Sequence, residues 1–256
     1  MEQFPLNSMK EYDLPYVNSI STGLSSQWTY SPSFYGVKLL ASASISLTNT
    51  RKKDYDAAEK ESGQKHTPGV TVWHHVYDFD RSTGKATMQL VAWNHHQETI
   101  PHAGGRKQYN AGYSQSNRQL LSDEDIPIIQ LNAPAYSLDA LNDFSNQTGL
   151  SLPREIRRFY NQDIQLNQEA LRRAALNDFH LDAILPLQDQ EGASVEGMHE
   201  FLKNHPTLSR LQDHTVTGLD ACGNLFCVDK TGAVLFYDHE TGELETTGLS
   251  LNDLMK

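Results

Sequence analysis

Histidines gather in one stretch of the chain. Six of the eleven histidines lie between His66 and His102, and they include two adjacent pairs, His74-His75 and His95-His96. Neutral imidazole is a good ligand for divalent metals, and it is the side chain best suited to proton transfer near neutral pH. Two pairs and a further histidine within so short a stretch predict a metal centre with a general base beside it.

This pattern suits phosphodiester hydrolysis. That reaction needs an activated water and a cation that stabilises the negative charge on the phosphate and on the leaving oxygen. One histidine of an adjacent pair can hold the metal while the other accepts the proton of the water. The histidines that follow in the chain can then complete the coordination.

The segment from residue 70 to residue 105 is expected to position these histidines. The β-branched and aromatic residues of 70–79 predict a strand, and residues 86–93 predict a second strand after the turn at 80–84. On a regular strand His74 and His75 point to opposite faces, so both reach one site only if the strand ends or bulges there. Strand, hairpin and strand, followed by a helix, form the outline of a ββα-metal nuclease site.

The helix after the second strand is expected to begin at Asn94. Asn94 and Gln97 have the spacing of a capping box, and Pro101 should end or kink the helix just before His102. Upstream, residues 56–62 predict a short helix that Gly63 ends. Arg106 and Lys107 follow the histidines as candidate phosphate contacts.

Composition and charge limit the class of protein. The 256 residues suffice for two domains, and the sequence contains neither a transmembrane run nor a visible signal peptide. We therefore expect a cytoplasmic protein. The first 130 residues are nearly neutral, whereas the remainder carries almost all of the net charge of −11. Such an acidic half repels phosphate backbones and could itself occupy a cationic site, although a merely solvated surface has the same composition.

The second half has a different organisation. We place the boundary near 126–137, which divides the chain into domains at 1–130 and 131–256. Ser137 should cap a helix that ends near Gly149, a second helix is expected with Pro153 as its first residue, and a third over 168–176. A hairpin is predicted from 225–229 and 233–238, followed by a short closing helix capped by Ser250. Helices followed by a late hairpin indicate an α+β domain.

Two features of this half were assigned no function. Cys222 and Cys227 lack partners for a zinc site and are interpreted as core residues. Asp238-His239-Glu240 could mimic a site, but we interpret it as a polar cluster at the end of a hairpin.

The histidine segment resembles the WHH family of toxin nucleases, which belongs to the HNH/endonuclease VII superfamily. The resemblance lies in Trp73-His74-His75, Thr87-Met88-Gln89-Leu90-Val91, His96 and Pro101-His102-Ala103-Gly104-Gly105, with similar features in Ser31–Val37 and Asp54–Ala58. It implies a treble-clef-like fold and a nucleic-acid substrate, with DNA favoured over RNA. It also implies His75 as general base and His74, His96 and His102 as ligands of one divalent metal ion: Mg, Mn, Zn or Ni. His95 competes with His96 for the ligand role, and His95, Asn94, Arg106 and Lys107 are possible auxiliary residues.

The second half resembles the SUKH superfamily of immunity proteins. The similar parts are Gly149–Phe159 and residues 218–254, and they imply a domain that binds and neutralises a toxin without catalytic residues of its own. The leading hypothesis is therefore a nuclease of the bacterial polymorphic toxin type fused to an immunity-like domain that restrains it. The cognate toxin or immunity domain would be the partner, and a secretion system would deliver the toxin part to other cells. The alternatives are a non-catalytic binding protein with a decayed nuclease domain and an interaction protein with a structural metal site.

Overall fold

The computed structural model describes residues 29–30, 39–48, 50–100, 102–110, 131, 134–161, 165–189 and 192–255. The upstream segment Ser31–Val37 and the predicted boundary at residue 130 lie outside these residues. The first half contains β1 (Thr29–Tyr30), β2 (Leu39–Ser46), α1 (Arg51–Ser62), β3 (Thr71–His75), β4 (Lys85–Ala92), α2 (Trp93–Gln97), β5 (His102–Ala103) and α3 (Gly105–Asn110). The second half contains α4 (Leu138–Thr148), α5 (Arg154–Tyr160), α6 (Gln168–Leu176), β6 (Ala183–Ile184), α7 (Val195–Asn204), the 3₁₀ helix η4 (Pro206–Leu211), β7 (Thr215–Leu219), β8 (Leu225–Val228), β9 (Ala233–Tyr237), β10 (Leu244–Ser250) and α8 (Leu251–Leu254).

A three-stranded antiparallel sheet with the order β2-β4-β3 supports the histidine segment. The predicted hairpin of β3 and β4 is present, and its register is regular up to the pair His75–Met88. β3 ends at His75, and its pairing with β4 contains no bulge. Of the two expected ways to bring His74 and His75 to one site, the structure therefore has the strand end. A parallel two-stranded pairing of β1 with β5 holds His102.

Helix α1 is longer than the sequence predicts. Its N-cap is Thr50, whose side chain accepts a hydrogen bond from the backbone N–H of Lys53, and Gly63 ends the helix in the left-handed region. The basic run Arg51-Lys52-Lys53 therefore forms the first turn of the helix. Arg51 and Lys52 are buried.

The predicted capping box at Asn94 is wrong. Helix α2 begins one residue earlier, its N-cap is Ala92, and no side chain caps it. The Asn94 side chain instead accepts a hydrogen bond from the backbone N–H of His95. The helix is only one turn long, which explains why its boundary depends on the packing of Trp93 more than on a cap.

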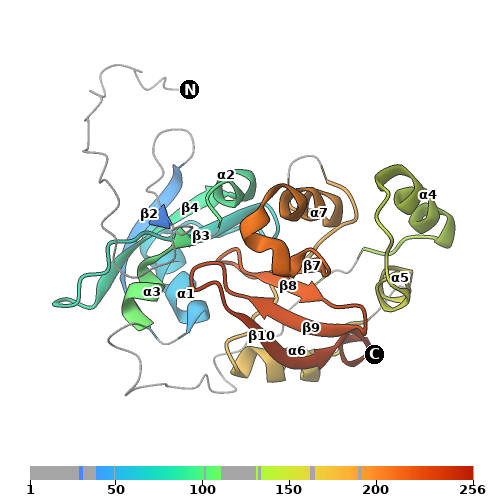
Figure 1. The fold of residues 1–256 in the computed structure, drawn as a ribbon. Coiled ribbons are helices and arrows are strands. Elements are labelled where there is room, and N and C mark those ends of the chain that lie inside the picture. Colours follow the sequence, from blue (N-terminus) through green and yellow to red (C-terminus); the bar gives the residue numbers. More distant parts are fainter. Residues whose placement is uncertain are drawn as a thin grey trace, which may run out of the picture.

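The second half is built on a five-stranded antiparallel sheet with the order β10-β9-β8-β7-β6. Figure 1 shows α6 on one side of this sheet and α7 on the other, with α4 and α5 at the end remote from β2–β4. The predicted helices α4 and α6, the hairpin β8–β9 and the closing helix capped by Ser250 are confirmed. Pro153 is the N-cap of α5 and not its first residue. The sequence did not predict β6, α7, η4, β7 or β10.

The two halves share their apolar interior. Val72, Val91 and Trp93 of the first half belong to the large buried cluster formed mainly by the second half. Ala221 and Cys222 belong to the buried cluster of the first half, and the backbone N–H of Trp73 donates a hydrogen bond to the carbonyl of Ala221. The halves are therefore held together by buried apolar contacts as well as by polar ones. Among the helices of the described ranges, none is long and apolar enough to cross a membrane.

Candidate metal centre at the junction of the two halves

Three of the predicted ligands come together. His74 at the end of β3, His96 on α2 and His102 on β5 each offer a nitrogen, and these nitrogens lie within 4.8 Å of one another. The ring centroids are 4.8 to 5.4 Å apart, and all three side chains are buried. His95, the competing ligand, lies half-buried on α2 and is not part of this group.

The electrostatics of the cluster fit a metal ion. Burial lowers the pKa of His96 and of His102, and neighbouring histidines lower the pKa of His96 further. Both rings are therefore neutral at physiological pH and present a lone pair. Nδ1 of His102 lies 3.2 Å from the backbone carbonyl of Thr99, which fixes the ring and leaves its buried Nε2 without a hydrogen-bond partner. Neutral imidazoles oriented in this way form a suitable donor set for a borderline divalent cation.

His75 lies beside the cluster and contacts carboxylates. Its Nε2 is 3.4 Å from Asp54 on α1, and its Nδ1 is 2.8 Å from Glu240 of the second half. Burial by itself would lower the pKa of His75, but Glu240 and Asp54 outweigh that effect and raise it to about 9. The predicted general base is therefore held as an imidazolium in this arrangement, because Glu240 stabilises the proton.

The predicted phosphate contact Arg106 is buried and engaged. Its guanidinium donates to Asp54 and to Asp178, each at 3.0 Å. Arg51 at the start of α1 also donates to Asp178, at 2.8 Å, and to Asp238. Burial by itself would lower the pKa of Arg51, but the charges of Asp238 and Asp178 outweigh that effect and raise this pKa above its usual value. Arg51 in turn holds the pKa of the buried Asp238 below its usual range. Lys107 is half-buried on α3. Asp178 and Asp238 of the second half thus pair with the buried Arg51 and Arg106 of the first half.

Sequence reasoning missed His239, a further histidine beside the group of three. His239, in the turn after β9, lies with its ring centroid 4.9 Å from that of His96 and 4.8 Å from that of His102. The interpretation of Asp238-His239-Glu240 as a mere polar cluster at a hairpin end is wrong, because all three residues face the centre of the first half. The only signal in the sequence was a histidine flanked by two acids in a predicted turn.

A second turn of the C-terminal half also reaches the cluster. Gly223 adopts a positive φ of 86°, and an added Cβ would lie 2.8 Å from the His96 ring. The following residue, Asn224, accepts a hydrogen bond from the backbone N–H of His239 and lies 2.8 Å from its Nδ1. The turns before β8 and after β9 therefore form one wall of the site.

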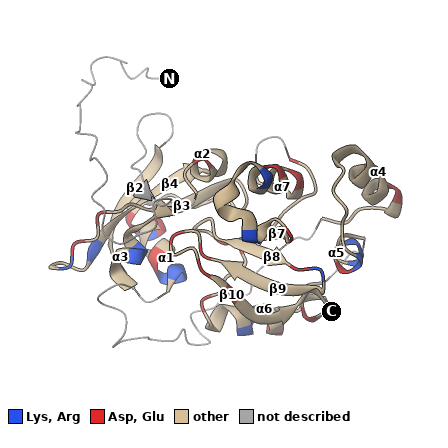
Figure 2. Ribbon diagram, in the orientation of Figure 1, with Lys and Arg blue, Asp and Glu red and all other residues tan. Residues whose placement is uncertain are grey.

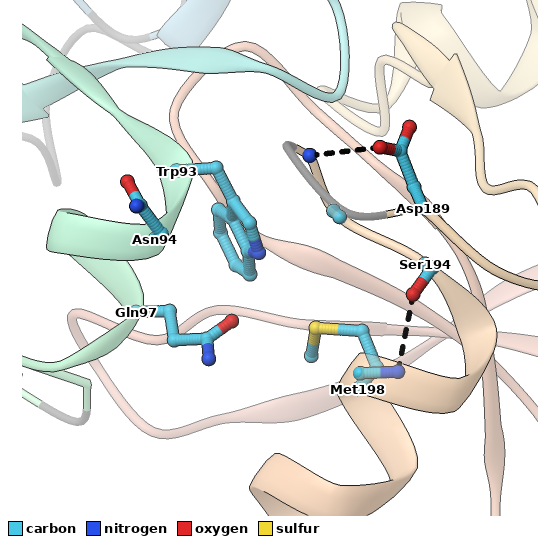
Figure 3. A pocket seen from close by; sticks show the side chains of 9 residues that line it. Trp93, Asn94, Gln97, Asp189, Ser194 and Met198 are labelled. Atoms are coloured by element: carbon cyan, nitrogen blue, oxygen red, sulfur yellow. Dashed lines mark hydrogen bonds between the residues drawn. The ribbon is translucent and has the colours of Figure 1, made fainter.

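A cavity of about 380 Å³ opens beside α2. Figure 3 shows Trp93, Asn94 and Gln97 of α2 on one side of it and Asp189, Ser194 and Met198 on the other. Hydrogen bonds from the backbone of Gly192 to Asp189 and of Gly197 to Ser194 shape the second wall. None of the four clustered histidines lines this cavity. The exposed Asn94 thus lines a cavity that is separate from the histidine cluster.

The charge distribution agrees with a closed site. Figure 2 shows Lys and Arg interspersed with Asp and Glu along α1 and α5. Within the described ranges, the buried arginines Arg51 and Arg106 both pair with carboxylates.

Comparison with known families agrees with this geometry. Residues 63–112 match the family model of WHH, a nuclease of the HNH/ENDO VII superfamily with conserved WHH. The matched segment contains His74, His75, His96 and His102. No match was found among curated proteins or among solved structures. The comparison supports a nuclease domain in the first half.

Proposed function

We propose that this protein is a metal-dependent endonuclease whose C-terminal half binds and restrains it. The observation that carries the proposal is the group of three buried histidines whose nitrogens lie within 4.8 Å of one another. The group lies next to His75, inside a segment that matches a nuclease family. The substrate would be nucleic acid, with DNA favoured, and the cofactor one divalent ion: Mg, Mn, Zn or Ni.

The residues of the first half have distinct roles in this proposal. His74, His96 and His102 would hold the ion, which when bound supplies a Lewis acid for the phosphate and lowers the pKa of a water. His75 would accept the proton of the attacking water, for which it must first be deprotonated. Asp54 lies 3.4 Å from Nε2 of His75 and orients its ring. Arg51 and Arg106 would stabilise the charge of the phosphate once they are released from their carboxylates.

The restraining role of the second half is supported by charge. Asp178, Asp238 and Glu240 all come from that half, and they pair with Arg51, Arg106 and His75. An immunity-like domain of SUKH type at 131–256 would thus neutralise a toxin-type nuclease at 1–130 within one chain. Delivery of the nuclease part from the cytoplasm to other cells by a secretion system belongs to the same proposal.

One observation favours a different function. Glu240 contacts His75 and the His239 ring lies beside that of His96, an arrangement that also suits a permanently closed site in a non-catalytic binding protein with a decayed nuclease domain. A four-histidine sphere would equally suit a structural metal. Both of these functions predict that the protein cuts no nucleic acid with any metal ion.

Cleavage assays on the full chain distinguish the two functions. Plasmid DNA and RNA would be incubated with Mg²⁺, Mn²⁺, Zn²⁺ or Ni²⁺ and either the wild type or Glu240→Gln. The endonuclease proposal expects metal-dependent cutting by the variant that His75→Ala in the same background removes. If neither protein cuts under any metal, the non-catalytic function is supported instead.

A further inference from the structure

The turn after β9 enters the centre of the first half. Asp238 pairs with Arg51, the His239 ring lies beside those of His96 and His102, and Glu240 contacts His75. These three residues are 1 to 3% exposed, so the contacts are shielded from solvent. We refer to Asp238, His239 and Glu240 as the closing turn.

His239 is prepared as a ligand. Its Nδ1 lies 2.8 Å from the side-chain oxygen of Asn224, whose amide donates to Asp220 at 2.7 Å. The amide oxygen of Asn224 can only accept, so the proton sits on Nδ1 of His239. Its buried Nε2 then has a lone pair and no hydrogen-bond partner. A buried imidazole whose second nitrogen is fixed in this manner is typical of a metal ligand.

The closing turn is also fitted to the backbone of the metal segment. A Cβ at Gly104, two residues after His102, would overlap the Glu240 carboxylate and approach the His75 carbonyl to 2.9 Å. Only glycine at this position lets Glu240 reach His75. On the other side, the His96 ring fits against Gly223 in the turn that carries Asn224.

We propose that His239 is the fourth metal ligand and that the closing turn thereby switches off the centre, an inference that rests on the nuclease function proposed above. Catalytic metal sites keep a coordination position open for water or substrate, whereas closed four-ligand sites are structural. With His74, His96 and His102, a fourth imidazole from the other half fills that position. Glu240 at the same time holds the general base. Withdrawal of one turn would free both the coordination position and the base.

Metal binding tests the ligand directly, without reference to activity. The full chain would be stripped with a chelator and titrated with Co²⁺, whose visible absorption reports the coordination. His239→Ala should alter the spectrum, because water replaces a nitrogen, and should weaken Co²⁺ binding by at least about tenfold, since loss even of an outer partner costs that much. His199→Ala is the matched control, because His199 lies on α7 outside the cluster.

Folding must be checked for the same variants. Circular dichroism of the metal-free proteins shows whether His239→Ala retains the fold, and His239→Asn provides a second, polar replacement if alanine does not. An unchanged Co²⁺ spectrum and affinity in a folded His239 variant would overturn the ligand assignment.

Cleavage then tests the switch. His239→Ala and Glu240→Gln should each increase cutting at saturating metal, whereas Glu243→Gln, which removes an exposed carboxylate near the same turn, should leave it unchanged. Cutting by the wild type that neither variant increases would overturn the switch and leave the nuclease intact. An altered Co²⁺ spectrum without cutting by any variant would overturn the nuclease function and its switch, and leave His239 as a ligand of a structural metal.

Discussion

Nδ1 of His75 lies 2.8 Å from a carboxylate oxygen of Glu240, although the two residues belong to opposite halves of the chain. The contact joins His75, the proposed general base in the segment that matches a nuclease family, to a carboxylate of the C-terminal half. In the same turn, Asp238 pairs with Arg51, and the His239 ring lies beside that of His96. The residues that would restrain the centre therefore contact the residues that would carry out catalysis.

Mutation of His75 and mutation of His102 should impair different properties of the protein. In the Glu240→Gln background, His75→Ala should lower cleavage by about 10² to 10⁴-fold with the metal retained, because it removes proton transfer only. His102→Ala should weaken the metal itself. Isothermal titration with Zn²⁺ beside a plasmid-cutting assay separates the two effects. Equal loss of metal in both variants would contradict this division of roles.

Gly223→Ala should disturb the metal centre from the second half. The new Cβ would lie 2.8 Å from the His96 ring, and the φ of 86° is strained for alanine by about 1–2 kcal/mol. We expect a lower melting temperature and Zn²⁺ binding weakened by about tenfold or more, comparable to the loss of an outer-sphere partner. Gly248→Ala is the control: its φ is 70° and nothing lies within 4 Å of the new Cβ. If both variants bound Zn²⁺ equally, the contact of Gly223 with His96 would be unimportant.

Asp178 should be a strong stabiliser of the junction. It has a φ of 68° and accepts hydrogen bonds from the backbone and guanidinium of Arg51 and from Arg106. Asp178→Ala removes a partner of two buried cations and should lower the free energy of unfolding by about 3 kcal/mol. Asp178→Asn keeps an acceptor and a residue that tolerates the left-handed region, so it should cost less. Urea unfolding of both variants tests the order, and an equal loss would show that the charge alone matters.

Acid should destabilise the fold through His180. This buried histidine faces Asp178, Lys52 and Arg51, and burial is the main reason that its pKa is lowered from 6.5 to about 4. The folded state therefore binds fewer protons than the unfolded state between these pH values. The stabilisation is complete above pH 6.5 and is lost as the pH falls towards 4, by roughly 3 kcal/mol in total.

His180→Gln removes this titration. The difference in free energy of unfolding between wild type and variant, measured by urea unfolding at several pH values, should therefore change by that amount from pH 7 to pH 4. A difference that is independent of pH would rule out His180 as the source.

The sequence by itself determined the elements that follow from local rules. Ser137 and Gly149 bound α4 because a side-chain N-cap and a left-handed C-cap are encoded within a few residues. The hairpin of β3 and β4 follows from its β-branched residues and the turn at Asp80–Gly84. The grouping of His74, His96 and His102 was expected from their spacing and from the family resemblance, since all three lie within one supersecondary unit. The short helix α2 was located less accurately, because one turn contains too little signal to fix its ends.

The contacts between the histidine segment and the second half follow only from the tertiary structure. No local rule connects His239 with His96, or Glu240 with His75, because these contacts depend on how two separately formed sheets pack. The buried apolar residues that both halves share, including Trp93 and Ala221, fix that packing. Once it is fixed, a turn that looked like an ordinary hairpin end brings an imidazole and a carboxylate into the candidate metal centre.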